Sequence, residues 1–148
     1  MRTLLKKLRN RGKDERGAAL VEFAIIMPLL LTLVLGIVEF GWLLSNDLDI
    51  RHGAREAARQ AAVNAGSVAT MGATTCDSMN LATGEVITFT QIGGSGIGSE
   101  AEVKVRLDPF NSLTSFFGGL MPADREQVVR IRLEQPATWA SGGTYTCP

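Results

Sequence analysis

The chain has 148 residues, which leaves room for one small folded domain in addition to a membrane segment and argues against a second core. Its 15 Lys and Arg balance its 15 Asp and Glu, but the charges are unevenly distributed: residues 1–17 carry +5 and the remainder carries −5. The basic run has no aromatic or helix-turn-helix support beside it, so we expect no nucleic-acid partner.

A long apolar segment directly follows the basic amino terminus. Residues 24–38 contain no charged side chain, and their apolar flanks extend the segment from Ala18 to Leu44. At about 1.5 Å per residue this helix is roughly 40 Å long, enough to cross a hydrocarbon layer of about 30 Å. A secretory signal peptide has a shorter apolar part that ends in a small-residue cleavage site, and no such site follows Leu44.

We therefore predict one transmembrane helix over residues 18–44, preceded by a basic leader over residues 1–17. Basic residues beside a span favour the cytoplasmic side, so the amino terminus should be cytoplasmic and the long carboxyl-terminal part extracytoplasmic.

A second helical stretch is predicted over residues 45–66. Its alanines recur at spacings of three and four, no proline separates it from the span, and Gly66 is the expected stop. Arg51, Arg55 and Arg59 form a basic stripe, which we interpret as a solvated face. Asp47 precedes Arg51 by four residues and is placed to pair with it.

Residues 67–148 are predicted to form a small β-rich domain outside the membrane. Residues 67–77 are small and polar, which is typical of a linker or loop. Alternating apolar residues predict strands at 85–92, 100–107 and 126–135. The fold class is thus α+β, with a long amino-terminal membrane-spanning helix continuing into an alanine-rich helix, and a small antiparallel sheet packed on it.

The two cysteines, Cys76 and Cys147, both lie on the side predicted to be extracytoplasmic, where disulfides persist. We treat them as a candidate disulfide, with two buried thiols as the alternative. Closing a loop between positions 71 apart would stabilise the domain by about 4 kcal/mol in the chain-entropy model.

No constellation of side chains points to catalysis, a metal or a cofactor. The only histidine, His52, has no cysteine, serine or carboxylate at a metal-ligand or triad spacing, so we expect no enzymatic activity. The glycine-rich loop between the first two strands lacks a phosphate-binding spacing.

Two carboxylates lie in or beside the apolar helix, where an ionised group costs about 2.5 to 3.5 kcal/mol at the centre and less toward the ends. Glu39 is near the outer boundary, where we expect water to reach it, and it suits either an interfacial position or contact with a partner helix. Glu22 is only four residues after Ala18, just beyond the basic segment. A position near the outer boundary, as for Glu39, therefore does not explain Glu22.

The residues R-G-A-A-L-V-E-F-A, from Arg16 to Ala24, resemble the processing junction of type IV prepilins, and more closely the TadE-like pseudopilins of Flp (tight adherence) pili. The resemblance continues through Pro28 and its leucine run, Gly36 to Glu39, and Ala54 to Arg59. It covers the chain to about Asn64, whereas the sheet region matches only loosely.

The resemblance implies that a prepilin peptidase cuts between Gly17 and Ala18, which makes Glu22 the fifth mature residue. The freed amino group is positive near neutral pH and could pair with Glu22 of a neighbouring subunit in a low-dielectric bundle. The implied partners are the peptidase, other pilins or pseudopilins, pilus assembly platform proteins and membrane lipid, in a bacterial inner membrane.

The expected function is that of a minor pseudopilin, a structural or assembly component. The major Flp-type pilins resemble little more than a helix, whereas this chain has an additional domain over residues 67–148. The alternative is an unprocessed single-pass membrane protein whose outer domain binds a ligand or partner.

Overall fold

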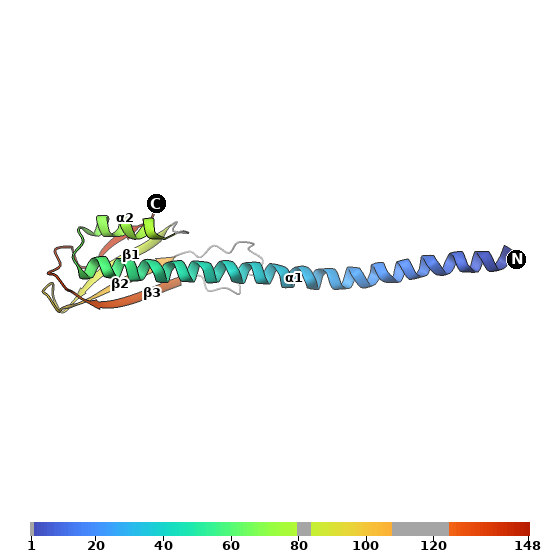
Figure 1. Ribbon diagram of the computed structural model, residues 1–148, viewed down its shortest axis with the longest axis horizontal. Coiled ribbons are helices and arrows are strands. Elements are labelled where there is room, and N and C mark those ends of the chain that lie inside the picture. The colour runs from blue at the N-terminus through green and yellow to red at the C-terminus, as the bar shows by residue number, and fades with distance from the viewer. Residues whose placement is uncertain (1, 80–83, 108–124) are drawn as a thin grey trace. The chain divides into compact units, whose positions relative to one another are not determined.

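The computed structural model describes the backbone of residues 2–79, 84–107 and 125–148, and the side chains of these ranges from residue 17 onward. The chain divides into two compact units, Met1–Phe40 and Gly41–Pro148, and we call the second the outer unit. The elements follow in chain order in Figure 1: α1 (Arg2–Ala62), α2 (Val68–Ser78), β1 (Glu85–Ile92), β2 (Glu100–Leu107), β3 (Arg125–Arg132) and β4 (Gly143–Thr146).

The first element, α1, is a single α-helix, which confirms that the predicted span and the alanine-rich stretch are continuous. Pro28 lies inside it, and the Thr32 hydroxyl donates a 2.8 Å hydrogen bond to the Pro28 carbonyl oxygen. By length and composition, the part of α1 from Gly17 onward could cross a membrane, and the most apolar stretch in it is not buried by the rest of the chain.

Helix α1 ends at Ala62, four residues before the stop expected at Gly66. Asn64 adopts a left-handed conformation with φ of 52°. The Ala65 amide then donates to the Gln60 carbonyl oxygen at 3.0 Å, and the Asn64 amide donates to that of Ala61 at 3.3 Å. These two bonds form a Schellman motif, so asparagine rather than glycine provides the end of this helix.

The sheet has the order β3-β2-β1-β4, and all its neighbouring strands are antiparallel. The bounds of β1 and β2 are those predicted, and the two strands pair from Glu85 with Leu107 to Ile92 with Glu100. The third strand is shorter than predicted and begins one residue earlier. The fourth strand, β4, was not predicted, because four residues carry too little alternation to be recognised.

The prediction of a loop over residues 67–77 was wrong, because this segment forms α2. Ser67 caps the helix: its hydroxyl oxygen accepts a 3.2 Å hydrogen bond from the Thr70 amide. The helix contains threonines and a glycine, residues with weak helix propensity, so its stability depends on the cap and on tertiary packing.

The core of the outer unit lies between α1, α2 and one face of the sheet. Buried alanines of α1 pack with alternating residues of β1 and β2, including Ile87, Phe89, Val103 and Val105. The alanines are Ala54, Ala57, Ala58 and Ala61. Burying a side chain such as Phe89 contributes about 1.5 to 3 kcal/mol. The α+β architecture, with the sheet packed on the alanine-rich helix, is thereby confirmed.

Candidate functional site

The predicted cleavage junction lies on an exposed part of α1. Gly17 and Ala18 are both exposed, and none of the side chains that the structure describes lies within 4 Å of where a Cβ on Gly17 would be. The backbone is helical on both sides of the junction. The site therefore presents an accessible peptide bond inside a helix, with the smallest possible side chain on its amino-terminal side.

Glu22 lies on α1 one helical turn beyond Ala18, and its side chain is exposed. The large apolar side chains next to it are exposed as well, with Val21 62% and Phe23 59% accessible. No ion pair to Glu22 occurs among the residues that the structure describes. A carboxylate on an apolar, outward-facing helix surface is available to a second molecule.

Glu39 differs from Glu22, because its side chain is fully buried although its neighbours Val38 and Phe40 are 45% and 57% exposed. The expectation that water reaches Glu39 was therefore wrong. Leu43 and Asn46, four and seven residues later, are also buried, so one face of α1 is covered from Glu39 onward. The prediction placed Glu39 near the outer boundary of the apolar helix from hydropathy alone. Hydropathy does not show which face of a helix is buried.

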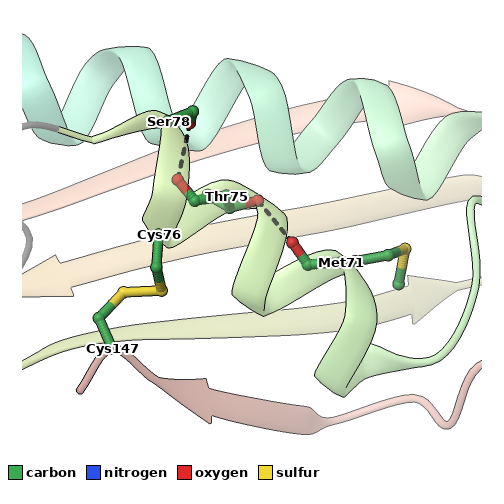
Figure 2. Close-up of a disulfide and its surroundings, with 5 residues drawn as sticks. All are labelled: Met71, Thr75, Cys76, Ser78 and Cys147. Atoms are coloured by element: carbon green, nitrogen blue, oxygen red, sulfur yellow. Dashed lines mark hydrogen bonds between the residues drawn. A yellow bond between two sulfur atoms is a disulfide. The ribbon is translucent and has the colours of Figure 1, made fainter.

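The two cysteines are joined in a disulfide that connects α2 to the carboxyl-terminal end of the chain, with a Cα–Cα distance of 5.7 Å. Figure 2 shows the bridge running from Cys76 to Cys147 just beyond β4. In the same helix, the Thr75 hydroxyl donates to the Met71 carbonyl oxygen at 2.8 Å and the Ser78 hydroxyl donates to that of Thr75 at 2.6 Å (Figure 2).

Two further contacts align α2 with β4. A Cβ added to Gly143 would lie 2.7 Å from Cγ2 of Val68, and one added to Gly72 would lie 2.5 Å from Cβ of Tyr145. The helix positions are four residues apart, a rise of about 6 Å, and the strand positions are two residues apart, a rise of about 6.8 Å. Because the two rises are similar, α2 and β4 stay in register over three successive contacts. These are Val68 with Gly143, Gly72 with Tyr145, and the Cys76–Cys147 disulfide.

The basic stripe of α1 is partly neutralised by acidic neighbours on the same helix. The Arg51 guanidinium pairs with Asp47 at 2.9 Å, as predicted, and that of Arg59 pairs with Glu56 at 2.6 Å. The hydrogen bond from Arg59 and a second one from Gln60 lower the pKa of Glu56 to about 2. Arg55 has no such pair within the described ranges.

His52 is exposed on the same helix. In the part of the chain that the structure describes, no three or more His, Cys, Asp or Glu side chains are grouped so that they could hold a metal ion.

Two exposed leucines of α1 were not singled out from the sequence as surface residues. Leu44 and Leu48 are 46% and 66% exposed, and they lie beside buried Leu43 and Asp49. Their spacing of four would have placed them on one helix face. Only the packing of the sheet shows that this is the face turned outward.

A comparison with known protein families matches residues 17–59 to the TadE-like protein family. No curated protein and no solved structure matches the chain. The match begins at Gly17, includes Glu22 and Glu39, and ends three residues before the last residue of α1. Together with the apolar helix, the match is consistent with a single-pass membrane protein associated with a Tad pilus. The resemblance seen in the sequence is confirmed over residues 17–59, which match the model of the TadE-like protein family.

Proposed function

We propose that this chain is a minor pseudopilin, a non-enzymatic component of Tad (Flp) pilus biogenesis, anchored in the bacterial inner membrane with its amino terminus in the cytoplasm. The observation that carries the proposal is that the family match begins at Gly17, the residue that ends the basic leader. The match also covers the outward-facing apolar helix. The extracytoplasmic sheet then adapts, caps or primes the assembly.

Processing between Gly17 and Ala18 is supported by the local structure of the junction. A peptidase that binds its substrate as an extended strand must first unwind the helix around the cleaved bond. Glycine costs about 1 kcal/mol relative to alanine in a helix interior, so Gly17 lowers the work of unwinding at this position. Cleavage removes a segment with a charge of +5 and leaves the apolar helix with a new amino terminus.

Glu22 gains a role once the leader is removed. A carboxylate within an apolar helix is costly unless a cation or another polar group satisfies it. The new α-amino group of Ala18 is such a cation, and pairing between neighbouring subunits would favour side-by-side packing of their apolar helices. This assembly role is consistent with the exposure of Glu22 and of the apolar side chains around it.

Amino-terminal sequencing of the full chain, expressed in a host with an active prepilin peptidase, tests the proposal. We expect the mature chain to begin at Ala18. Gly17→Leu should abolish processing because a bulky side chain enters the peptidase groove. Gly41→Leu is the matched control, since Gly41 is also an exposed α1 glycine with no side chain within 4 Å of its added Cβ. An intact amino terminus in the unsubstituted chain would refute processing.

That refuting result would favour the alternative function, an unprocessed membrane-anchored protein that binds a ligand or partner through its outer unit. The observation behind this alternative is the separate core of Gly41–Pro148, which is closed by its own disulfide.

A further inference from the structure

The Cys76–Cys147 disulfide lies inside the folded outer unit. Cys76 is 8% exposed and Cys147 is 3% exposed, and both belong to the hydrophobic core. A disulfide is reduced or exchanged when a thiolate attacks one of its sulfur atoms, so the rate depends on access to them. The outer unit must therefore open before this bond can react.

Cys147 is held in place by the backbone as well as by the bridge. Its amide donates to the Glu85 carbonyl oxygen at 2.9 Å, and its carbonyl oxygen accepts a hydrogen bond from the Gly84 amide at 3.3 Å. These bonds continue the pairing of β4 with β1 beyond Thr146. Release of Cys147 therefore breaks backbone hydrogen bonds and pulls on α2 through the bridge (Figure 2).

Helix α2 and strand β4 support each other. Gly72 packs against Tyr145, and Val68 lies beside the backbone of Gly143. Neither element is stable alone, because α2 has 11 residues and β4 has four. Isolated helices shorter than about 12 residues are marginal in water. We therefore expect α2 and β4 to detach together.

The rest of the outer unit has more extensive pairing. Strand β2 pairs with β1 and with β3 over eight residues each, whereas β4 pairs with β1 over four. Strand β4 is also at an edge of the sheet. Local opening occurs where it breaks the fewest stabilising contacts. Detachment of α2 and β4 leaves the pairing of the other three strands intact and exposes both sulfur atoms.

We propose that α2 and β4 form one redox-controlled part of the outer unit, which we call the α2–β4 subdomain. The Cys76–Cys147 bond is made or reduced only while this subdomain is detached, and docking of the subdomain then shields the bond. The inference uses one part of the proposed function, the extracytoplasmic position of the outer unit. It holds whether or not the chain is cleaved after Gly17.

The bond forms by exchange with an extracytoplasmic dithiol oxidoreductase in its disulfide form. The thiolate of one cysteine attacks that disulfide, which gives a mixed disulfide and releases one thiolate of the oxidoreductase. The thiolate of the second cysteine then attacks the sulfur of the first. The oxidoreductase leaves as a dithiol, with the two electrons and two protons that the cysteines have lost.

The detached state differs from the docked state in its surface. Strand β4 covers the edge of β1 from Val86 to Phe89, so detachment leaves these backbone groups open to another chain. The buried side chain of Met71 in α2 also loses its cover. Oxidation of the two cysteines thus determines whether the outer unit keeps this edge closed.

Reduction kinetics of the full chain in detergent test the proposal. The chain is incubated with dithiothreitol at fixed pH, free thiols are alkylated at set times, and mass spectrometry measures the labelled cysteines. We expect reduction of the folded chain to be at least about 100-fold slower than reduction of the chain in denaturant. Similar rates in the two conditions would overturn the proposal, because the bond would then be accessible without opening.

Two variants separate detachment of the subdomain from unfolding of the whole outer unit. Gly72→Ala disturbs the contact with Tyr145 and should speed reduction roughly tenfold. Val129→Ala is the matched control, because Val129 is partly buried on β3, at the opposite edge of the sheet from β4. It should lower the denaturant midpoint but leave the reduction rate within about twofold. Acceleration by both variants in proportion to their lost stability would show that the outer unit opens as a whole, which overturns the proposal.

Val68→Ala is a milder variant to use if Gly72→Ala does not fold. It removes methyl groups beside Gly143 and should speed reduction by roughly threefold. An unchanged rate would show that Cys147 opens without α2, and would overturn joint detachment. Amino-terminal sequencing of the same samples reports on processing separately, since the reduction rates are expected to be the same for the cleaved and the intact chain.

Discussion

Gly72 of α2 and Tyr145 of β4 pack so closely that a Cβ added to Gly72 would lie 2.5 Å from the Cβ of Tyr145. The contact involves the root of the tyrosine side chain, which cannot move without moving β4. Gly72 is therefore required for close packing between a short helix and the edge of the sheet, although glycine is unfavourable within a helix.

Gly72→Ala should destabilise the outer unit by about 1 to 3 kcal/mol, because overpacking outweighs the gain in helix propensity. The free energy of unfolding of the full chain in detergent, measured with denaturant, checks this. Gly96→Ala is the control, because its added Cβ meets only the Ser99 hydroxyl oxygen at 4.0 Å, so its stability should be nearly unchanged. Combining Gly72→Ala with Tyr145→Gly, which removes the Cβ that the new methyl group would meet, should recover part of the loss, and strictly additive losses would contradict the proposed clash.

Removing the disulfide by replacing Cys76 and Cys147 with alanine should cost about 4 kcal/mol, because the unfolded chain is no longer constrained across 71 positions. Denaturant unfolding with and without a reductant measures the loss. The double variant should be insensitive to reductant, whereas the unsubstituted chain should lose stability on reduction. Equal stability of the oxidised and reduced forms would show that packing alone holds α2 against β4.

Reduction of the Cys76–Cys147 disulfide should destabilise β4 before the other strands. Among the strands that the structure describes, β4 pairs with β1 alone, over Val86 to Phe89, and the disulfide follows its last residue directly. We expect hydrogen exchange to quicken at Tyr145 and its neighbours in the reduced protein while the β1–β2 pairing stays protected. Uniform acceleration across all strands would instead indicate that the sheet unfolds as one unit.

Glu22→Gln should leave cleavage at Gly17 intact and lower copurification with other pilins or pseudopilins by roughly tenfold, the equivalent of about 1.4 kcal/mol. The physical reason is the loss of the carboxylate that we propose to pair with the α-amino group of Ala18 in a neighbouring subunit. Quantitative mass spectrometry of purified complexes provides the measurement. Glu22→Asp keeps the charge and should retain most of the association, and unchanged assembly in Glu22→Gln would refute the role of this residue.

The Glu56–Arg59 pair should make a small, pH-dependent contribution to stability. The pKa of Glu56 is lowered from 4.5 to about 2 in the folded protein, so the folded state favours the ionised carboxylate. The contribution is therefore complete above pH 4.5 and is lost as the pH falls toward 2. The Arg59 side chain is 68% exposed, so solvent screening keeps the contribution small.

Unfolding measured between pH 2 and pH 6 for the unsubstituted chain and for Glu56→Gln checks this sign. The difference in free energy should be largest near pH 6 and should vanish near pH 2. A difference that grows on acidification would contradict the assignment.

The local sequence determined the parts of this protein that depend on neighbouring residues. Hydropathy and the absence of charge placed the span, alanine spacing extended it into a second helical stretch, and alternation located β1 and β2. The proposed junction at Gly17 and Ala18 was also recognisable locally, because the resemblance that suggests it rests on a short run of consecutive residues. These features need no knowledge of which distant segments meet.

The tertiary structure decided the features that depend on contacts between distant residues. Helix α2 combines weak helix formers that hold their shape by packing against β4, and β4 itself is too short to be recognised before that packing is known. Asn64 ends α1, and its side-chain oxygen accepts 3.1 Å hydrogen bonds from the backbone amide and hydroxyl of Thr138, 74 residues later. Burial of Glu39 and exposure of Leu48 likewise depend on which side of α1 is covered, and periodicity alone cannot distinguish the two sides of an apolar helix.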